Sequence, residues 1–162
     1  MIAGCAGSGK STLARALAAR TGLPLVERDR LGILGSDQYR AAVSRLAGEP
    51  RWILDGAPYY VDDLVYAAAD TVVFLDYPKL VVMWRVLRRT LGIELMRRPA
   101  GAHRPQGLAA WRDREHAVLW AWSSHRDRHQ EGLALPARPV LAGAEVIRFS
   151  RPADARRWLR HV

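Results

Sequence analysis

The stretch GCAGSGKS, from Gly4 to Ser11, has the residue types and spacing of a phosphate-binding loop. It matches the pattern G-x-x-x-x-G-K-[ST], with a short apolar run before it and a stretch of helical periodicity after it. Glycines let successive N–H groups turn inward, and Lys10 can then reach the phosphates of a nucleotide while Ser11 ligates Mg²⁺. The residues predicted to bind ATP are Gly4, Gly7, Ser8, Gly9, Lys10, Ser11 and Thr12.

Lysine usage supports this interpretation of the loop. Among 25 basic residues only Lys10 and Lys79 are lysines. A lysine is a compact charge on a flexible stem, whereas arginine presents a planar fork. Because this chain otherwise uses arginine, a lysine at position 10 favours a role that suits a compact, flexible charge, such as binding phosphates.

A nucleotide-bound Mg²⁺ also needs a carboxylate near it, usually at the end of a neighbouring apolar strand. Two aspartates compete for this role. Asp55 ends the run WILD and precedes Gly56, which allows a close approach to the phosphates, and Asp76 ends TVVFLD. We favour Asp55 as metal ligand and catalytic residue, and the alternative for Asp76 is a helix cap.

Composition indicates one folded domain of 162 residues, with 49% hydrophobic and 25% charged residues. The single cysteine, Cys5, excludes an intramolecular disulfide, and the first residues do not resemble a signal peptide, so we expect a cytoplasmic protein. The net charge of +9 arises in the second half, because residues 82–162 carry sixteen basic and seven acidic side chains. This half is expected to meet a polyanion, which nucleotide phosphates or a nucleic acid would supply.

Apolar periodicity predicts alternating strands and helices, which is typical of an α/β fold with a parallel sheet covered on both faces. The predicted strands are 1–3, 24–27, 51–55, 71–76 and 145–149. The predicted helices are 10–21, 36–48, 59–69, 79–98, 108–132 and 152–162, with a Pro/Gly-rich loop at 99–107. Ser36 or Asp37 is the expected cap of the second helix.

The segments GCAGSGKSTLA, RWILDGAPY, ADTVVFLDYP and WRVLRRTLG, in this order, resemble the P-loop nucleoside and nucleotide kinases. The most similar group is the adenylate-kinase-like one often labelled DNA topology modulation proteins. The resemblance implies a three-layer sandwich with a central first strand in a five-stranded parallel sheet, Mg·ATP as phosphoryl donor, and an arginine-bearing lid within residues 85–130. Met1-Ile2-Ala3 is a short version of that first strand.

The lid arginines implied by the resemblance begin on the helix 79–98. Arg85 and Arg89 match a pair four residues apart and are expected to be catalytic, and Arg88 on the same face is expected to contact the nucleotide. Three guanidinium groups there could neutralise a transferring phosphoryl group, whereas a solvated helix face is the alternative. Further candidates are Arg97, Arg98, Arg104, Arg126 and Arg128.

The acceptor side departs from the adenylate-kinase pattern. Tyr59 stands where those kinases carry an arginine that holds the acceptor phosphate. Asp29 follows the second predicted strand, where several small-metabolite kinases keep an aspartate that binds or deprotonates a hydroxyl. We therefore predict Asp29 as a catalytic residue, with Arg30 or Arg40 beside it, and a plain capping role is the alternative.

Two other patterns are interpreted as structural. Trp111, Trp120 and Trp122 recur among apolar residues and are predicted to pack in the core rather than to stack on bases. His125 and His129 have a metal-like spacing, but no cysteine or carboxylate pattern accompanies them.

Together the residues favour a single-domain ATP-dependent kinase, residues 1–162, acting on a nucleoside monophosphate or a hydroxyl acceptor, as a monomer or homodimer without a membrane partner. The alternative is a nucleotide-dependent nucleic-acid-binding NTPase that affects DNA topology. Its basic half would then bind along the phosphate backbone of a nucleic acid, and the binding affinity would fall steeply with salt concentration.

Overall fold

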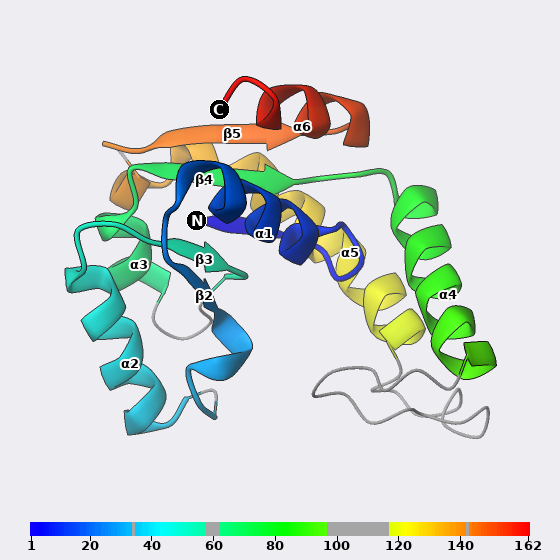
Figure 1. Cartoon of the computed structure of the whole chain (residues 1–162), viewed down its shortest axis with the longest axis horizontal. Coiled ribbons are helices and arrows are strands. Elements are labelled where there is room, and N and C mark those ends of the chain that lie inside the picture. Colours follow the sequence, from blue (N-terminus) through cyan, green and yellow to red (C-terminus); the bar gives the residue numbers. More distant parts are fainter. Residues whose placement is uncertain (34, 58–61, 97–116, 142) are drawn as a thin grey trace.

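The computed structural model describes residues 1–33, 35–57, 62–96, 117–141 and 143–162, which form a parallel sheet with helices on both faces (Figure 1). The strands are β1 (Ile2–Gly4), β2 (Leu25–Glu27), β3 (Ile53–Asp55), β4 (Thr71–Leu75) and β5 (Glu145–Phe149). The helices are α1 (Lys10–Thr21), α2 (Asp37–Gly48), α3 (Asp62–Ala68), α4 (Lys79–Met96), α5 (Ala117–Ala134) and α6 (Pro152–Leu159). Short 3₁₀ turns are η1 (Arg28–Arg30), η3 (Leu135–Ala137) and η4 (Pro139–Leu141).

The alternation of elements agrees with the prediction, and the differences lie at their ends. Of the two caps predicted for α2, Ser36 and Asp37, the structure has Ser36, whose hydroxyl accepts a hydrogen bond from the N–H of Tyr39. Helix α5 runs two residues past the predicted end, and α6 ends at Leu159 in a turn where the N–H of His161 bonds to the carbonyl of Trp158. The predicted loop 99–107 and the neighbouring parts of two predicted helices lie outside the described residues.

The sheet has the strand order β2-β3-β1-β4-β5, and all its pairs are parallel. Strand β1 is central, as the resemblance implied. Its Ile2 is in register with Asp55 of β3, and its Gly4 with Leu75 of β4. Because every strand runs the same way, the segments that follow β1, β2 and β3 all leave the sheet at one edge.

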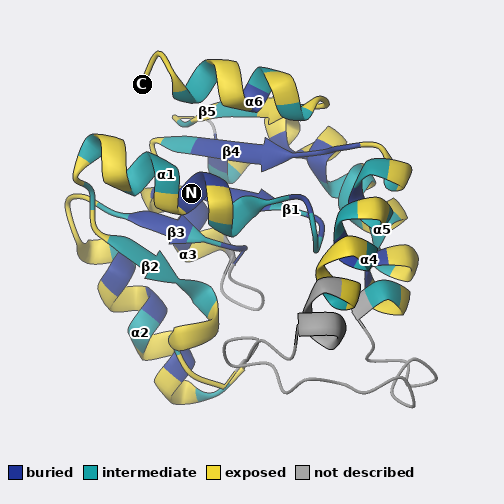
Figure 2. Ribbon diagram, turned by 45° about the vertical axis from the view of Figure 1, so that its right-hand side comes forward, coloured by how far each residue is buried: buried dark blue, intermediate teal, exposed yellow. Residues whose placement is uncertain are grey.

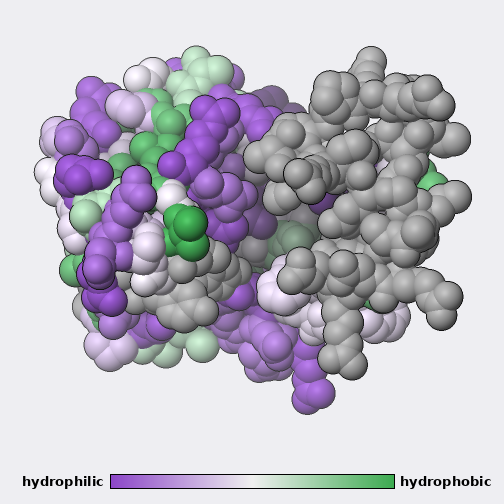
Figure 3. Space-filling model, turned by 90° about the horizontal axis from the view of Figure 1, so that it is seen from below, coloured by the Kyte–Doolittle hydropathy of each residue, from purple (hydrophilic) through white to green (hydrophobic). Residues whose placement is uncertain are grey.

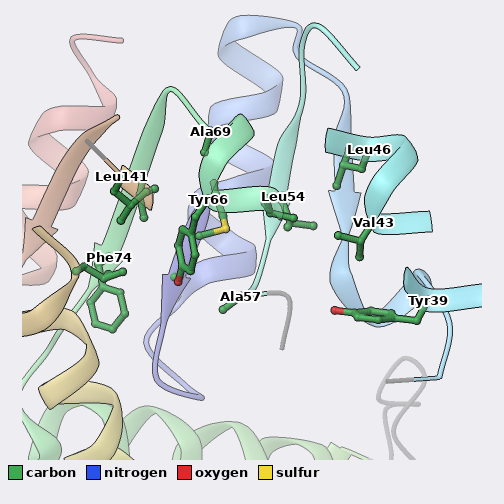
Figure 4. Packing of buried hydrophobic residues seen from close by; sticks show 14 residues of the cluster. Tyr39, Val43, Leu46, Leu54, Ala57, Tyr66, Ala69, Phe74 and Leu141 are labelled. Carbon is green, nitrogen blue, oxygen red and sulfur yellow. The ribbon is translucent and has the colours of Figure 1, made fainter. Parts of the chain in front are cut away.

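Two apolar cores lie on opposite faces of the sheet, since successive side chains of a strand point to opposite sides. Val72 and Phe74 of β4 belong to the core shared with α2 and α3, which Figure 4 shows from close by. Val73 and Leu75 belong to the core shared with α1 and α6. The buried colouring in Figure 2 follows β1, β3 and β4 accordingly. No residue of the edge strands β2 and β5 is fully buried, so the expectation of strands apolar on both sides holds only for the centre.

The tryptophans of α5 differ from the prediction of core packing. Trp120 is 54% exposed and Trp122 is 56% exposed, and Trp111 lies outside the described residues. The ammonium of Lys79 lies 3.4 Å from the centre of the Trp122 ring, which partly covers that face. Within the described part of the chain, no helix is both long and apolar enough to cross a membrane.

Helix α5 approaches the sheet closely at Gly132. A Cβ atom added there would lie 2.4 Å from Cε1 of Phe74, whose ring is fully buried. Such a separation is far inside van der Waals contact, and a buried ring cannot move aside without disturbing the core. Glycine at this position therefore sets the distance between α5 and β4.

We expect Gly132→Ala to lower the free energy of unfolding by about 1–3 kcal/mol, because overpacking outweighs the better helix propensity of alanine. Urea denaturation would measure this. Gly48→Ala is the matched control, since Gly48 ends α2 and nothing lies within 4 Å of its added Cβ. Equal stability changes in the two variants would contradict the close packing of α5 on Phe74.

Candidate functional site

The loop between β1 and α1 has the backbone of an anion cradle. Gly7 has φ 79°, and a Cβ there would lie 2.2 Å from Cγ2 of Val86 on α4. Gly9, with φ 95°, precedes α1 and has no side chain that could cap the helix. The first N–H groups of α1, at Lys10, Ser11 and Thr12, therefore face outward from an uncapped helix start, where the helix dipole also favours an anion.

The side chain of Lys10 folds back from the start of α1 onto the beginning of this loop. Its ammonium donates to the carbonyl of Cys5 at 2.9 Å. Burial lowers the pKa of Lys10, and the nearby carboxylate of Asp55 partly offsets this effect. A bound phosphate would favour the charged form of the lysine further, so the site has an ammonium that gains from an anion.

Asp55 and Ser11 are the residues whose types fit Mg²⁺, which prefers oxygen ligands and a carboxylate. Asp55 ends β3 at the same edge as the loop, and the N–H of the following Gly56 bonds to the carbonyl of Ile2 at 2.9 Å. Ser11 lies in the first turn of α1 and is partly exposed. The loop, Lys10 and these two oxygen donors together fit Mg·ATP in residue types and placement.

Asp76, the competing carboxylate, has a different role from the two that the sequence suggested. Its side chain is 4% exposed and accepts hydrogen bonds from Nε of Arg148 at 2.8 Å and from Nδ1 of His129 at 2.9 Å. Its own N–H bonds to the carbonyl of Phe149. The buried carboxylate of Asp76 thus joins β4 to β5 and α5, and its hydrogen bonds to described residues go to Arg148 and His129 rather than to the start of α4.

Helix α4 brings Arg85 to the phosphate-binding loop. Nη1 of Arg85 donates to the carbonyl of Ser8 at 2.7 Å, and its guanidinium lies 5.1 Å from the centre of the Tyr77 ring. Arg88 and Arg89 are exposed on the same helix. Of the three arginines predicted on α4, the structure places Arg85 against the loop and leaves the other two at the surface.

Helix α5 also contacts the loop, through Cys5. Sγ of Cys5 lies 3.9 Å from the carbonyl of Ala121, and burial raises the pKa of this thiol. Arg128 lies close enough for its charge to lower the pKa of both Lys10 and Cys5, and its Nη1 bonds to Oε2 of Glu131 at 2.5 Å. Arg126 is exposed, and Arg97, Arg98 and Arg104 lie outside the described residues.

Asp29 lies in η1, two residues beyond Glu27, which is in register with Asp55. Its side chain is 66% exposed and accepts a hydrogen bond from Nε of Arg28 at 2.9 Å. The partner predicted for Asp29 was Arg30 or Arg40. Arg30 instead pairs with Glu27 at 2.8 Å, and Arg40 is exposed on α2.

Arg28 is the residue of this site that the sequence reasoning missed. It is 23% exposed, packs along Gly56, and its charge lowers the pKa of Lys10. Its place directly after a strand at the carboxyl edge could have identified it. Figure 3 shows the molecule from below, where many of the described surface residues are hydrophilic and a few hydrophobic ones lie among them.

Comparisons of the whole chain with solved structures find the same fold. A shikimate kinase from Acinetobacter baumannii, in complex with shikimate, matches 99% of this chain and 87% of its own with a TM-score of 0.55 at 16% identity. The chain has the P-loop kinase fold. A shikimate kinase from Bacteroides thetaiotaomicron shares this fold with a TM-score of 0.53 at 16% identity, and the match covers 99% of this chain and 93% of the kinase. A sugar kinase from Janibacter also shares this fold, with a TM-score of 0.52 at 18% identity, and the match covers 99% of this chain and 88% of the sugar kinase.

At these identities the likeness concerns the P-loop kinase fold alone. No protein-family model matches the chain, and no curated protein matches it in sequence. The narrower resemblance to DNA topology modulation proteins stays a prediction. The P-loop kinase fold does account for the position of the site, because in open α/β sheets ligands bind beyond the carboxyl ends of the strands.

We expect Asp76→Asn to lower the free energy of unfolding by about 1–3 kcal/mol, because Arg148 and His129 lose a charged acceptor. Affinity for Mg·ATP should change little if Asp76 acts only in this network. Urea denaturation and calorimetric titration would measure both quantities, with the exposed Asp127→Asn on α5 as control. Unchanged stability with lost Mg²⁺ dependence would instead assign Asp76 to the metal.

Proposed function

We propose that the protein is an ATP-dependent kinase that transfers the γ-phosphoryl group of Mg·ATP to a hydroxyl group of a small molecule. One observation carries the proposal. Lys10 and the uncapped start of α1 form a candidate phosphate cradle. Arg85 of α4 contacts this loop at the carbonyl of Ser8, and Arg128 of α5 lies close enough for its charge to lower the pKa of Lys10. Such a concentration of cations at a glycine-rich loop is suited to a polyphosphate.

Phosphoryl transfer requires mainly positioning and charge neutralisation, and the residues of the site fit both tasks. The N–H groups of the loop and the ammonium of Lys10 would hold the phosphates of ATP. Ser11 and Asp55 would hold Mg²⁺, which supplies further neutralisation of the phosphate charge. From the exposed face of α4, Arg89 stays a proposed catalytic residue and Arg88 a proposed contact of the nucleotide.

The acceptor is proposed to bind between η1 and the loop. Asp29 is exposed there at the same edge of the sheet as Asp55, so its carboxylate could accept a proton from an acceptor hydroxyl. Several structural neighbours are described as shikimate kinases or a sugar kinase, which supports a small hydroxylated acceptor. A nucleoside monophosphate stays in the tested set because the sequence alone also allowed it.

The first test measures ADP formation from Mg·ATP with a panel of hydroxylated metabolites, nucleosides and nucleoside monophosphates. We expect one class of acceptor to raise the rate far above the background hydrolysis. Lys10→Ala should abolish that acceptor-dependent rate, because the lysine neutralises charge on the phosphates, while its thermal unfolding stays near that of the wild type. Full activity in Lys10→Ala would overturn the assignment of the loop.

The second test addresses the acceptor residue. With the acceptor found in the panel, we expect Asp29→Asn to lower kcat by about 10²–10⁴-fold, because the amide cannot accept the hydroxyl proton. Binding of ADP in the absence of acceptor should be unchanged. The control Asp37→Asn changes an exposed carboxylate in the first turn of α2. A normal kcat in Asp29→Asn would leave Asp29 as a partner of Arg28 only.

A second candidate function, nucleotide-dependent nucleic-acid binding, is favoured by a group of arginines in α6, at its two caps and at the end of α1. The group consists of Arg20, Arg151, Arg156, Arg157 and Arg160, all exposed. Within the described ranges none of them forms an ion pair with a carboxylate, unlike Arg28, Arg128 and Arg148. If DNA alone stimulates ATP hydrolysis in the panel, with a steep salt dependence, this candidate replaces the kinase.

A further inference from the structure

The contact between Arg85 and the loop is made with a main-chain atom. Nη1 of Arg85 donates to the carbonyl oxygen of Ser8 at 2.7 Å, across 77 positions of sequence. The resemblance to P-loop kinases implied a different role for this arginine, namely direct neutralisation of the phosphoryl group in transfer. In the structure the guanidinium acts on the peptide unit that joins Ser8 to Gly9.

That peptide unit links Arg85 to the phosphate cradle. The bond is trans, as are all peptide bonds between described residues, so its C=O and N–H point in opposite directions. Because the carbonyl of Ser8 points to Arg85, the N–H of Gly9 is directed away from that guanidinium. Gly9 is also the residue that precedes the first turn of α1, where an anion is expected to bind.

The position of Arg85 is itself constrained by its neighbours. Val86, the next residue on α4, contacts the loop so closely at Gly7 that no Cβ would fit there. The guanidinium also lies 5.1 Å from the centre of the ring of Tyr77, which is 4% exposed. A cation held between a buried aromatic ring and a carbonyl loses little conformational freedom when it makes the hydrogen bond.

We propose that Arg85 is a positioning residue for nucleotide binding, which holds the Ser8–Gly9 peptide so that the N–H of Gly9 donates to a phosphate. The hydrogen bond to the carbonyl also polarises the peptide and strengthens its N–H as a donor. This inference rests on the proposed function, because it requires that the loop binds a nucleotide.

The proposal differs from direct catalysis in what it predicts for ADP. A residue that contacts only the γ-phosphoryl group favours ATP and the transition state, and its loss lowers kcat without affecting ADP. A residue that shapes the loop affects the phosphates that ATP and ADP share. Loss of Arg85 should therefore weaken both nucleotides by a similar factor and change KM more than kcat.

The experiment is calorimetric titration of Mg·ADP and of a non-hydrolysable Mg·ATP analogue into the wild type, Arg85→Met, Arg85→Lys and Arg45→Met. Arg45 is an exposed arginine of α2 and serves as the matched control. We expect Arg85→Met to bind both nucleotides about tenfold more weakly, since a hydrogen bond to a charged group is lost. Arg85→Lys keeps one donor and should recover part of the affinity, and Arg45→Met should match the wild type.

Each other outcome overturns the inference, in a way that separates it from the proposed function. Unchanged ADP affinity in Arg85→Met, or a loss confined to the ATP analogue and kcat, assigns Arg85 to the transferred group or to no role in binding. Equal losses in Met and Lys variants with a lowered melting temperature indicate a structural role only. If the wild type itself binds neither nucleotide, or binds them as well as Lys10→Ala does, the proposed function fails together with the inference.

Discussion

The candidate site, at the carboxyl ends of the strands, depends on β1 lying between β3 and β4 in an all-parallel sheet. Because β1 is central, the loop that follows it lies between the segments that follow its two neighbours. Asp55 comes from one neighbour and Asp76 from the other. These two carboxylates differ in burial and in partners, since Asp55 is partly buried near Lys10, whereas Asp76 is buried and accepts hydrogen bonds from Arg148 and His129.

Charge around the loop follows from this arrangement. Lys10, Arg28, Arg85 and Arg128 come from four separate elements and meet near one segment of backbone. Their mutual repulsion is reduced by internal acceptors, namely Asp55, Asp29, the carbonyl of Ser8 and Glu131. A polyphosphate would supply a much larger compensating charge, which supports the proposal that this loop binds a strongly anionic ligand.

The helices α4 and α5 each make direct contact with the loop. Val86 of α4 packs on Gly7, and Ala121 of α5 lies against Cys5. The two helices also pack on one another, while Asp76 and His129 tie α5 to the sheet. A movement of these helices would shift the backbone of the loop as well, because close-packed interfaces transmit strain.

The sequence by itself determined the α/β class and the glycine-rich loop from Gly4 to Ser11, and it limited the cap of α2 to Ser36 or Asp37, because each depends on local spacing and backbone chemistry. It also indicated Asp55 over Asp76 from the adjacent glycine. Only the tertiary structure decided which distant residues meet. Arg28 pairs with Asp29 while Arg30 pairs with Glu27, Arg85 contacts a main-chain carbonyl, and Trp120 and Trp122 remain exposed. Helical spacing shows which residues share a face but not which face turns to the core, and the pairing of Asp76 with Arg148 requires two strands to be adjacent.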